Sequence, residues 1–253
     1  MKIESTQNST IKALAKLSTK KERDHSGKFL IEGWHLLEEA SQAGLLEHVY
    51  QLEIQPVFTD APVTFCTQPV LNKLSVQKSD ARYIGLCCKP DTHPLQKAKK
   101  VLLLDHLQDP GNLGTLIRSA LSFGLEAVVL SPDCADPYGP KAIQSSQGAL
   151  FHIPVETADL SLAIADLKSK EVPVFGAALH QDSRELHDLA VPARFAIMIG
   201  NEGQGIRPEL LEQCTQLIHI EMASFESLNA AIAGSILMYA FQFPAAGHYP
   251  SSH

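Results

Sequence analysis

The chain has 253 residues, of which 45% are hydrophobic and 19% are charged, and its formal net charge at pH 7 is −7. This composition is that of a globular protein, and the length suits one large domain or two small ones. No apolar run approaches the roughly 20 residues of a membrane-spanning helix, and residues 1–12 lack the apolar core of a signal peptide, so we expect a cytoplasmic protein without a membrane segment.

The cysteines and histidines are not spaced as in a metal site. The five cysteines include no C-x-x-C pair, and the eleven histidines include no H-E-x-x-H pattern. We therefore expect free thiols in a reducing compartment, no disulfide framework and no bound metal.

The first 30 residues are basic although the whole chain is acidic. They contain seven Lys or Arg and three Asp or Glu, a net charge of +4, so the remaining residues carry −11. A basic segment of this kind suits contact with the phosphates of a nucleic acid. A solvated helix face explains the same charges equally well, and charge alone does not separate the two interpretations.

Residues 1–90 are predicted to form a small α/β domain. The polar run at 8–10 can cap a helix whose apolar positions are Ile11, Leu14 and Leu17. A second helix is expected over 34–43, ended by Gly44. Strands are expected over 28–31, 49–54, 63–66 and 83–87.

Residues 98–242 are predicted to form a second domain, after a linker rich in Lys and Pro at 89–100. Strands are expected over 101–104, 127–130, 151–155, 172–177, 195–199 and 217–220. Helices are expected over 113–123, near 141, over 160–168, after 208 and over 228–241. This alternation predicts an α/β fold with a mostly parallel sheet covered on both faces. Residues 243–253 are expected to form a loosely ordered tail.

Three polar segments of the second domain follow predicted strands and precede predicted helices. They read DPGNLG at 109–114 with Arg118 further along, GNEGQG at 200–205, and SLN at 227–229. Since the carboxyl ends of parallel strands share one edge of a sheet, where ligands bind, we expect the segments to meet in one site. Singly, each has an ordinary explanation: a helix cap beside a surface arginine, a glycine-rich turn, and a helix cap by Ser227.

In this order and combination, the three segments resemble the signature motifs of the SpoU, or TrmH-like, branch of the SPOUT RNA methyltransferases. The resemblance covers residues 100–242, including the stretch 140–154, and residues 8–33 look like the opening of the substrate-binding extension that many members carry. It implies a trefoil knot near the carboxyl end, an obligate homodimer, and S-adenosylmethionine as the cofactor.

The resemblance also implies roles for single residues. The cofactor pocket would be lined by Gly200, Ile220 and Leu228. The polar site would be formed by Asn112, Arg118, Glu202, Ser227 and Asn229. Arg118 would reach the cofactor site of the partner subunit and promote loss of the ribose hydroxyl proton, with Glu202 and Asn229 orienting it. Two positions depart from the family pattern: Glu221 stands where proline is usual, and Gln144 stands where many members have arginine.

The implied function is transfer of a methyl group to a ribose 2′-hydroxyl of structured RNA, with ribosomal RNA favoured over transfer RNA by the substrate-binding extension. Such a transfer requires the oxygen, methyl carbon and sulfur to be held in line. A non-catalytic RNA-binding or assembly factor is one alternative, although binding alone does not need the polar set around Arg118 and Asn229. A dinucleotide-dependent enzyme is another, but the spacing G-x-x-G-x-G differs from the G-x-G-x-x-G fingerprint.

Overall fold

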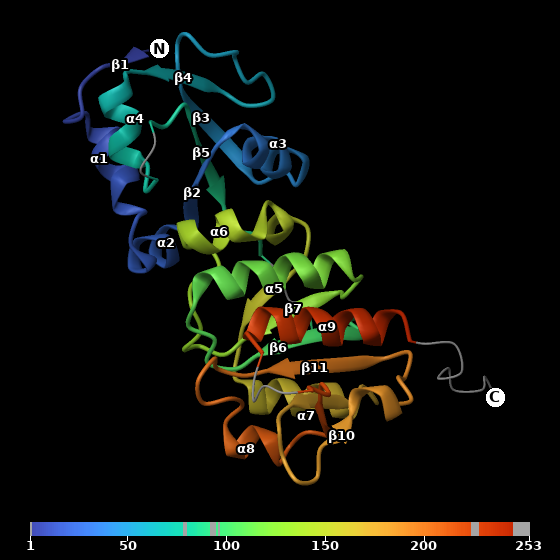
Figure 1. Ribbon diagram of the computed structural model, residues 1–253. Coiled ribbons are helices and arrows are strands. Elements are labelled where there is room, and N and C mark those ends of the chain that lie inside the picture. Colours follow the sequence, from blue (N-terminus) through green and yellow to red (C-terminus); the bar gives the residue numbers. More distant parts are fainter. Residues whose placement is uncertain (1, 78–79, 92–94, 96, 224–227, 245–253) are drawn as a thin grey trace. The chain divides into compact units, whose positions relative to one another are not determined.

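The computed structural model describes residues 2–77, 80–91, 95, 97–223 and 228–244 (Figure 1). The chain divides into two compact units: unit 1 is Met1–Asp91 with Asp136–His152, and unit 2 is Thr92–Ala135 with Ile153–His253. The linker predicted at 89–100 lies partly outside the described residues, and the predicted tail lies outside them from residue 245 onward.

Unit 1 is built on a mixed sheet. Its strands are β1 (Lys2–Ile3), β2 (Lys28–Glu32), β3 (Leu46–Leu52), β4 (Val63–Cys66) and β5 (Tyr83–Cys88). Its helices are α1 (Ser9–Lys16), α2 (Lys20–Ser26), α3 (Trp34–Gln42), α4 (Gln68–Leu74), α6 (Pro140–Ser146) and the 3-10 turn η2 (Ala149–Phe151). In the order β1-β4-β3-β5-β2, the first two pairs are parallel and the last two antiparallel.

The predicted helix that begins near residue 8 is present, but α2 and α4 were not predicted. Asn8 caps α1, whose Ile11 is fully buried. Thr19 caps α2 in the same way, yet Arg23 is the buried residue of that helix. Because α2 has no apolar stripe, the hydrophobic periodicity that predicts helices gives no signal there.

Residues 136–152 pack into unit 1 through buried side chains. The Arg23 guanidinium binds the Asp136 carboxylate at 2.5 Å, and the two side chains are only 5% and 11% exposed. Phe29 of β2 contacts the rings of Tyr138 and Phe151 at centroid distances of 5.0 and 6.0 Å. From the sequence, these residues had been assigned to the second domain, 98–242. The predicted division of function between residues 1–90 and 98–242 stays a prediction.

The strand predicted over 151–155 is wrong. Residues Ala149–Phe151 form η2, which follows Gly148 at a φ of +88°, and β8 begins only at Val155. The left-handed glycine turns the chain, and the apolar run at 149–151 reflects burial within unit 1 rather than strand pairing.

Unit 2 is built on a sheet in which every neighbouring pair of described strands is parallel. In sheet order the strands are β10 (Arg184–Glu185), β12 (Gln216–His219), β9 (Val174–Ala177), β11 (Phe195–Ile199), β6 (Lys100–Leu104), β7 (Ala127–Leu130) and β8 (Val155–Thr157). Its helices are α5 (Pro110–Ser122), α7 (Leu160–Ser169), α8 (Pro208–Leu211), α9 (Ala230–Gln242) and the 3-10 turn η3 (Leu186–Asp188). The predicted α/β fold with a mostly parallel sheet is confirmed.

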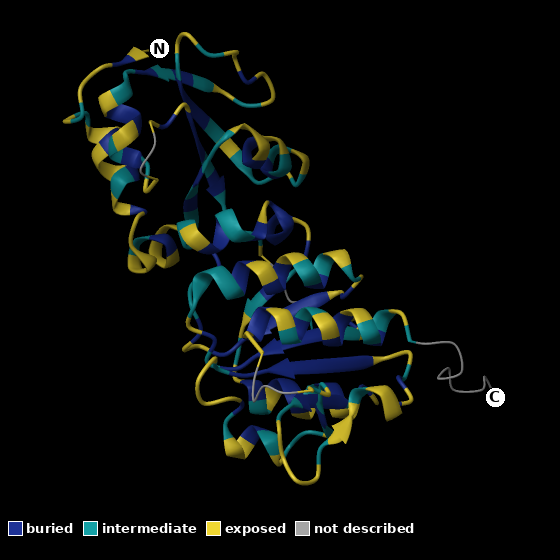
Figure 2. Cartoon of the chain, viewed as in Figure 1, coloured by how far each residue is buried: buried dark blue, intermediate teal, exposed yellow. Residues whose placement is uncertain are grey.

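Helices cover both faces of this sheet. Leu103 of β6 and Ile164 of α7 belong to one apolar cluster on one face. On the other face, Phe241 of α9 packs against Phe195 of β11 at a centroid distance of 5.0 Å. The central strands β6 and β11 are consequently buried along nearly their whole length (Figure 2).

The helices α5 and α9 lie side by side because small residues separate them (Figure 1). A Cβ atom on Gly234 would lie 2.4 Å from Cδ2 of Leu116, and the hydroxyls of Ser119 and Ser235 are 2.8 Å apart. The small side chains at the start of the last helix therefore serve helix packing. Among the described residues, no helix is long and apolar enough to cross a membrane.

Candidate active site

The site lies at the ends of the neighbouring strands β6 and β11. These strands run in parallel with Leu104 beside Ile199, and the backbone N–H of Asp105 donates to the Ile199 carbonyl at 2.9 Å. The turn into α5 and the glycine-rich turn at 200–205 therefore start next to each other. Since α9 packs on α5, its first turn reaches the same edge of the sheet.

A chain of hydrogen bonds links three of the predicted residues across these segments. The Asn229 amide donates to Oδ1 of Asn112 at 3.0 Å, and the Asn112 amide donates to Oε1 of Glu202 at 3.0 Å. Glu202 also accepts from the backbone N–H groups of Asp109 at 3.1 Å and Gln108 at 3.4 Å. Side chains that lie 90 and 117 residues apart in the sequence thus form one network.

The network is anchored to the first turns of both helices. The Asp109 carboxylate caps α5 by accepting from the backbone N–H of Asn112 at 2.8 Å. The Asn229 side chain caps α9 by accepting from two backbone N–H groups of its first turn. The capping role considered for Ser227 therefore belongs to Asn229, and Ser227 itself lies outside the described residues.

Glu202 is held as a carboxylate. Burial disfavours its charge, but hydrogen bonds from the Asn112 side chain and from backbone N–H groups outweigh burial and keep the pKa of Glu202 below its usual value. A carboxylate stabilised in this way is a weak proton acceptor. Its position suits it to orient the Asn112 amide.

Close backbone packing shapes the turn at 200–205. A Cβ atom on Gly200 would lie 2.1 Å from the carbonyl carbon of Gly205 and 2.2 Å from the backbone nitrogen of Ile206. Asn201 and Gly205 exchange backbone hydrogen bonds of 2.9 and 3.0 Å, and Gly205 has a φ of +73°. At Gly200 the backbone of the turn itself therefore leaves no room for a side chain.

A cavity of about 440 Å³ opens beside this turn. Gly200, Ile220 and Leu228, the residues predicted to hold a cofactor, all line it. The volume is within the usual range for small-molecule sites. The described lining residues include the acidic residue Glu202 and no Lys or Arg. The cavity therefore suits a largely apolar or cationic ligand better than the pyrophosphate of a dinucleotide.

Arg118 is the predicted residue that the structure does not bring into the network. It is exposed on α5, and within the described residues no hydrogen bond or ion pair joins it to another group. Six residues of helix separate it from Asn112, which turns its side chain about 240° around the helix axis. Its guanidinium is available to a group from another molecule.

An ion pair that was not predicted from the sequence lies next to the site. The Asp105 carboxylate is fully buried and accepts from the Arg207 side chain at 2.8 and 2.5 Å and from the Arg207 backbone at 2.9 Å. The bonds to Asp105 raise the pKa of Arg207, and they tie the end of β6 to the residues after the glycine-rich turn. A signal was present, since an acid that directly follows a buried strand needs a partner.

Comparison with known proteins finds relatives that share both units. Residues 99–239 match the family model described as the SpoU rRNA Methylase family, and residues 8–85 match the MRM3-like substrate binding domain. The chain is 37% identical over 243 residues to the 23S rRNA (guanosine(2553)-2′-O)-methyltransferase RlmP of Bacillus subtilis (strain 168), covering 94% of this chain and 97% of that protein.

Solved structures resemble the chain over nearly its whole length. The AdoMet-bound rRNA methyltransferase from Sinorhizobium meliloti is 24% identical and has the same fold, with a TM-score of 0.87 over 96% of this chain and 97% of that chain. An RNA 2′-O ribose methyltransferase is 30% identical, with a TM-score of 0.78 over 94% of this chain and 97% of that chain.

Proposed function

The chain belongs to the SpoU rRNA methylase family, and from this premise we propose that it transfers a methyl group from S-adenosylmethionine to a ribose 2′-hydroxyl of ribosomal RNA. Ribosomal RNA is favoured over transfer RNA because the Bacillus subtilis relative, named for a 23S rRNA nucleotide, matches nearly the whole chain. The observation that carries the proposal is the meeting of a cofactor-sized cavity with the Glu202–Asn112–Asn229 network at one sheet edge.

We assign Gly200, Ile220 and Leu228 to the cofactor site. They would hold the cofactor through backbone groups and apolar contacts, since all three line the cavity. When bound, S-adenosylmethionine supplies a methyl group on a positively charged sulfur. The lining fits this group, because Glu202 is a carboxylate and the described lining residues include no Lys or Arg to oppose a cation.

The polar residues of the site fall into two groups. Three of them bind one another, and Arg118 binds no other described residue. The side chains of Asn112, Glu202 and Asn229 bind one another, so their proposed role is to hold the site in one geometry. Arg118 is open, and we assign to it contact with the target nucleotide. A guanidinium is a poor base because its pKa is very high. Arg118 would instead stabilise the developing oxyanion while the proton passes to a phosphate or to solvent, and Ser227 joins this site on the resemblance alone.

The protein is proposed to act as a homodimer in which Arg118 serves the partner's site. Apolar side chains are exposed at helical spacing along and just beyond α9, where Ile232, Ile236, Tyr239 and Phe243 are 53%, 38%, 54% and 53% exposed. A contiguous apolar patch of this kind marks a contact surface, and two-fold dimers are the commonest assemblies. Because α5 lies beside α9, a second copy on this patch would lie near Arg118.

Residues 1–90 are proposed to bind the RNA. Three of the seven cationic side chains in the first 30 residues are paired within unit 1: Lys2 with Glu53, Arg23 with Asp136, and Lys28 with Glu47. The other four are exposed on α1 and α2 and form no ion pair among the described residues: Lys12, Lys16, Lys20 and Lys21. These four lysines make a surface suited to phosphates.

We also propose that the chain of unit 2 forms a trefoil knot and that the protein is cytoplasmic. The sheet order places β12 between β9 and β10, so the chain after β11 returns between two earlier segments. The five cysteines are free thiols, as expected in a reducing compartment.

Calorimetric titration with S-adenosylhomocysteine tests the proposed site. We expect the wild type to bind with micromolar affinity and Leu228→Arg, which places a charge on a half-exposed cavity wall, to abolish binding. Gly200→Trp should also abolish it, although the clash with the backbone there endangers folding. Leu162→Arg, at an exposed position of α7, is the matched control and should bind normally. A folded wild type that does not bind would contradict the proposal and favour a non-catalytic RNA-binding factor.

A further inference from the structure

The segment 220–222 forms one wall of the proposed cofactor cavity. Ile220 and Met222 line the cavity, and Glu221 lies between them. The side chain of Glu221 contacts a different part of unit 2, the segment that contains β10 and η3. Glu221 is also one of the two positions where the sequence departs from the family pattern.

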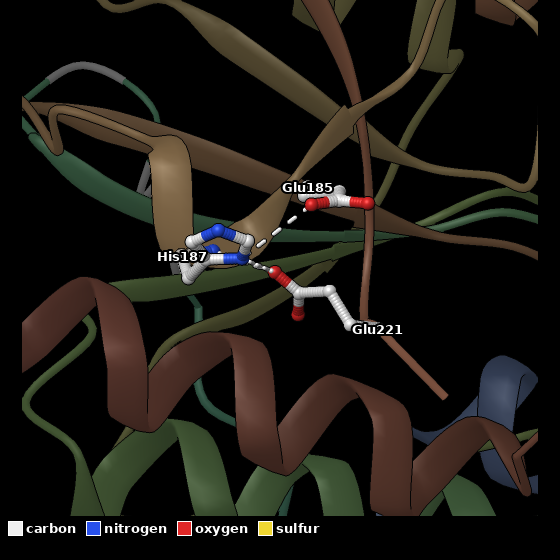
Figure 3. A group of neighbouring side chains, drawn as sticks. All are labelled: Glu185, His187 and Glu221. Atoms are coloured by element: carbon white, nitrogen blue, oxygen red, sulfur yellow. Dashed lines mark hydrogen bonds and ion pairs between the residues drawn. The ribbon is translucent and has the colours of Figure 1, made fainter. Parts of the chain in front are cut away.

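Glu221 makes two contacts with a single residue of that segment. Its Oε1 accepts a hydrogen bond from the backbone N–H of His187 at 2.9 Å, and the same oxygen contacts Nδ1 of the His187 ring (Figure 3). The pairing of β10 with β12 ends where Glu185 lies beside His219. The contacts of Glu221 therefore hold the segment after β12 against the segment after β10, beyond the last paired residues of the two strands.

The attached segment is itself connected to a second part of the cavity lining. Residues 177–179 line the cavity and lead into the loop that returns as β10. Within this loop, the hydroxyl of Ser183 lies 2.9 Å from Nδ1 of His219. Contacts at His219 and at Glu221 thus join the loop that follows residues 177–179 to the segment that contains Ile220 and Met222.

We infer that His187 and Glu221 are positioning residues, a latch that holds the Ile220 wall against the cofactor. This inference rests on the proposed function, because it assigns the latch to the same cofactor site. The two residues need not touch the cofactor, since their effect passes through Ile220 and Met222. Loss of the latch should leave the fold intact and weaken cofactor binding.

Three carboxylates face the His187 ring, which makes the latch sensitive to pH. Besides Glu221, these are Glu185 at 3.6 Å and Asp188 at 3.2 Å. The hydrogen bond to Glu221 and the neighbouring charges raise the pKa of His187. Burial opposes the charge of Glu221, but hydrogen bonds from the His187 backbone and ring outweigh burial and lower the pKa of Glu221. Below the raised pKa of His187 both groups are charged, and the attraction is lost as the pH rises through that pKa.

Titration with S-adenosylhomocysteine, in the wild type and in latch variants, tests the inference. We expect His187→Ala and Glu221→Ala each to weaken binding by about 2- to 5-fold, because exposed ion pairs contribute little. The double variant should bind no more weakly than the weaker single variant, because both remove one interaction. Asp182→Ala, an exposed acid in the same loop, is the matched control and should bind as the wild type does.

The pH profile gives a readout that a purely structural role would not change. Wild-type affinity should fall as the pH rises above about 6.5, the ordinary pKa of a histidine, through the raised pKa of His187. The affinity of His187→Ala should stay flat over the same range. Additive single effects, wild-type affinity in both variants, or parallel pH profiles would overturn the latch. So would a loss of affinity on adding EDTA, since ligand atoms of Glu185, His187 and Glu221 lie within 4.8 Å of one another and a cation could bridge them.

Amide hydrogen exchange of residues 219–223 in the cofactor-free protein separates this inference from the proposed function. Exchange should be faster in the His187→Ala and Glu221→Ala variants than in the wild type and in Asp182→Ala. Faster exchange together with no ligand binding by the wild type would support the contact but contradict the proposed function and the cofactor role of the latch. Unchanged exchange would overturn the latch whatever the binding result.

Discussion

In both units, hydrogen bonds of charged side chains join residues that are far apart in the sequence. The network of unit 1 is nearly buried, whereas the network of unit 2 is accessible to a ligand. In unit 1, Arg23 and Asp136 are nearly buried, and Arg23 also donates to the Leu17 carbonyl at 2.7 Å. In unit 2, the network of Asn112, Glu202 and Asn229 lies at an accessible sheet edge, beside a cavity. A buried network stabilises the fold, whereas a network at an accessible sheet edge holds polar side chains in position to contact a ligand.

The sheets explain why the open network is in unit 2. All its described strand pairs are parallel, so the turns after β6 and β11 leave the sheet at the same edge. The sheet of unit 1 is mixed, so its strands end at both edges and their turns are divided between them. Variants in the two networks should therefore separate stability from activity.

The largest effect is expected from Arg23→Ala. It leaves the Asp136 carboxylate buried without its cation, which should lower the free energy of unfolding by about 3–5 kcal/mol. Urea unfolding measures the change, with Lys21→Ala, an exposed cation of the same helix, as the control within about 0.5 kcal/mol of wild type. Equal stability of Arg23→Ala and Lys21→Ala would contradict the structural role of the pair.

The next largest effect is expected from Arg118→Ala. This variant should lose activity but keep its stability. Loss of a group that stabilises developing charge should reduce methyl transfer by about 100- to 1,000-fold. The free energy of unfolding should change by less than about 0.5 kcal/mol, because Arg118 is exposed. Single-turnover methylation and calorimetry on the same preparation would show the split. Normal activity in this variant would remove Arg118 from the site.

A smaller effect is expected from Glu202→Gln. The substitution keeps the shape but removes the charge that the Asn112 amide and two backbone N–H groups donate to, and activity should fall about 10-fold. Because the pKa of Glu202 is lowered in the folded state, its contribution to stability is present above about pH 4.3 and is lost as the pH falls through the folded value.

The difference in free energy of unfolding between wild type and Glu202→Gln should therefore shrink on acidification below about pH 4. Urea unfolding at neutral and acidic pH measures it, with Glu212→Gln, an exposed acid of unit 2, as the matched control. A difference independent of pH would show that Glu202 is not a stabilised carboxylate.

The smallest effect is expected at the lysines of unit 1. Lys12→Gln with Lys16→Gln should weaken RNA binding a few-fold and reduce the slope of log affinity against log salt by about 1.4 to 1.8, if both contact phosphates. Lys2→Gln is the control, because Lys2 is paired with Glu53. An unchanged slope would favour the solvated helix face over the RNA-binding interpretation.

The sequence predicted the parallel sheet of unit 2 because its strands are continuous apolar runs separated by helical patterns. It also brought Asn112, Glu202 and Asn229 into one predicted site, since each follows or precedes such an element. It could not predict the pairing of Arg23 with Asp136, because a contact across 113 residues leaves no local pattern. Gln144 had been noted as standing where many family members have arginine, and in the structure its amide donates to the Glu32 carbonyl at 3.1 Å.

Other differences have the same physical origin. Gly200 was predicted only as a lining residue of the cofactor pocket, and the sequence does not show that residues 205 and 206 fold back onto it. The ion pair of the buried Asp105 with the partly exposed Arg207 was missed because charged residues were considered as ligands to substrate rather than to each other. Local sequence patterns thus predicted the helices and strands and the edge of the sheet where the site lies. Contacts between distant residues determine which partner each polar side chain has.

The proposed activity of unit 2 is methylation of a ribose hydroxyl of ribosomal RNA. The most direct measurement incubates the wild type with S-adenosylmethionine labelled in its methyl group and with unmodified 23S ribosomal RNA or transfer RNA, followed by alkaline hydrolysis. We expect label in ribosomal RNA, retained in a dinucleotide that resists alkali because its 2′-oxygen is methylated. Label on a base, label confined to transfer RNA, or no label from a protein that binds S-adenosylhomocysteine would contradict it.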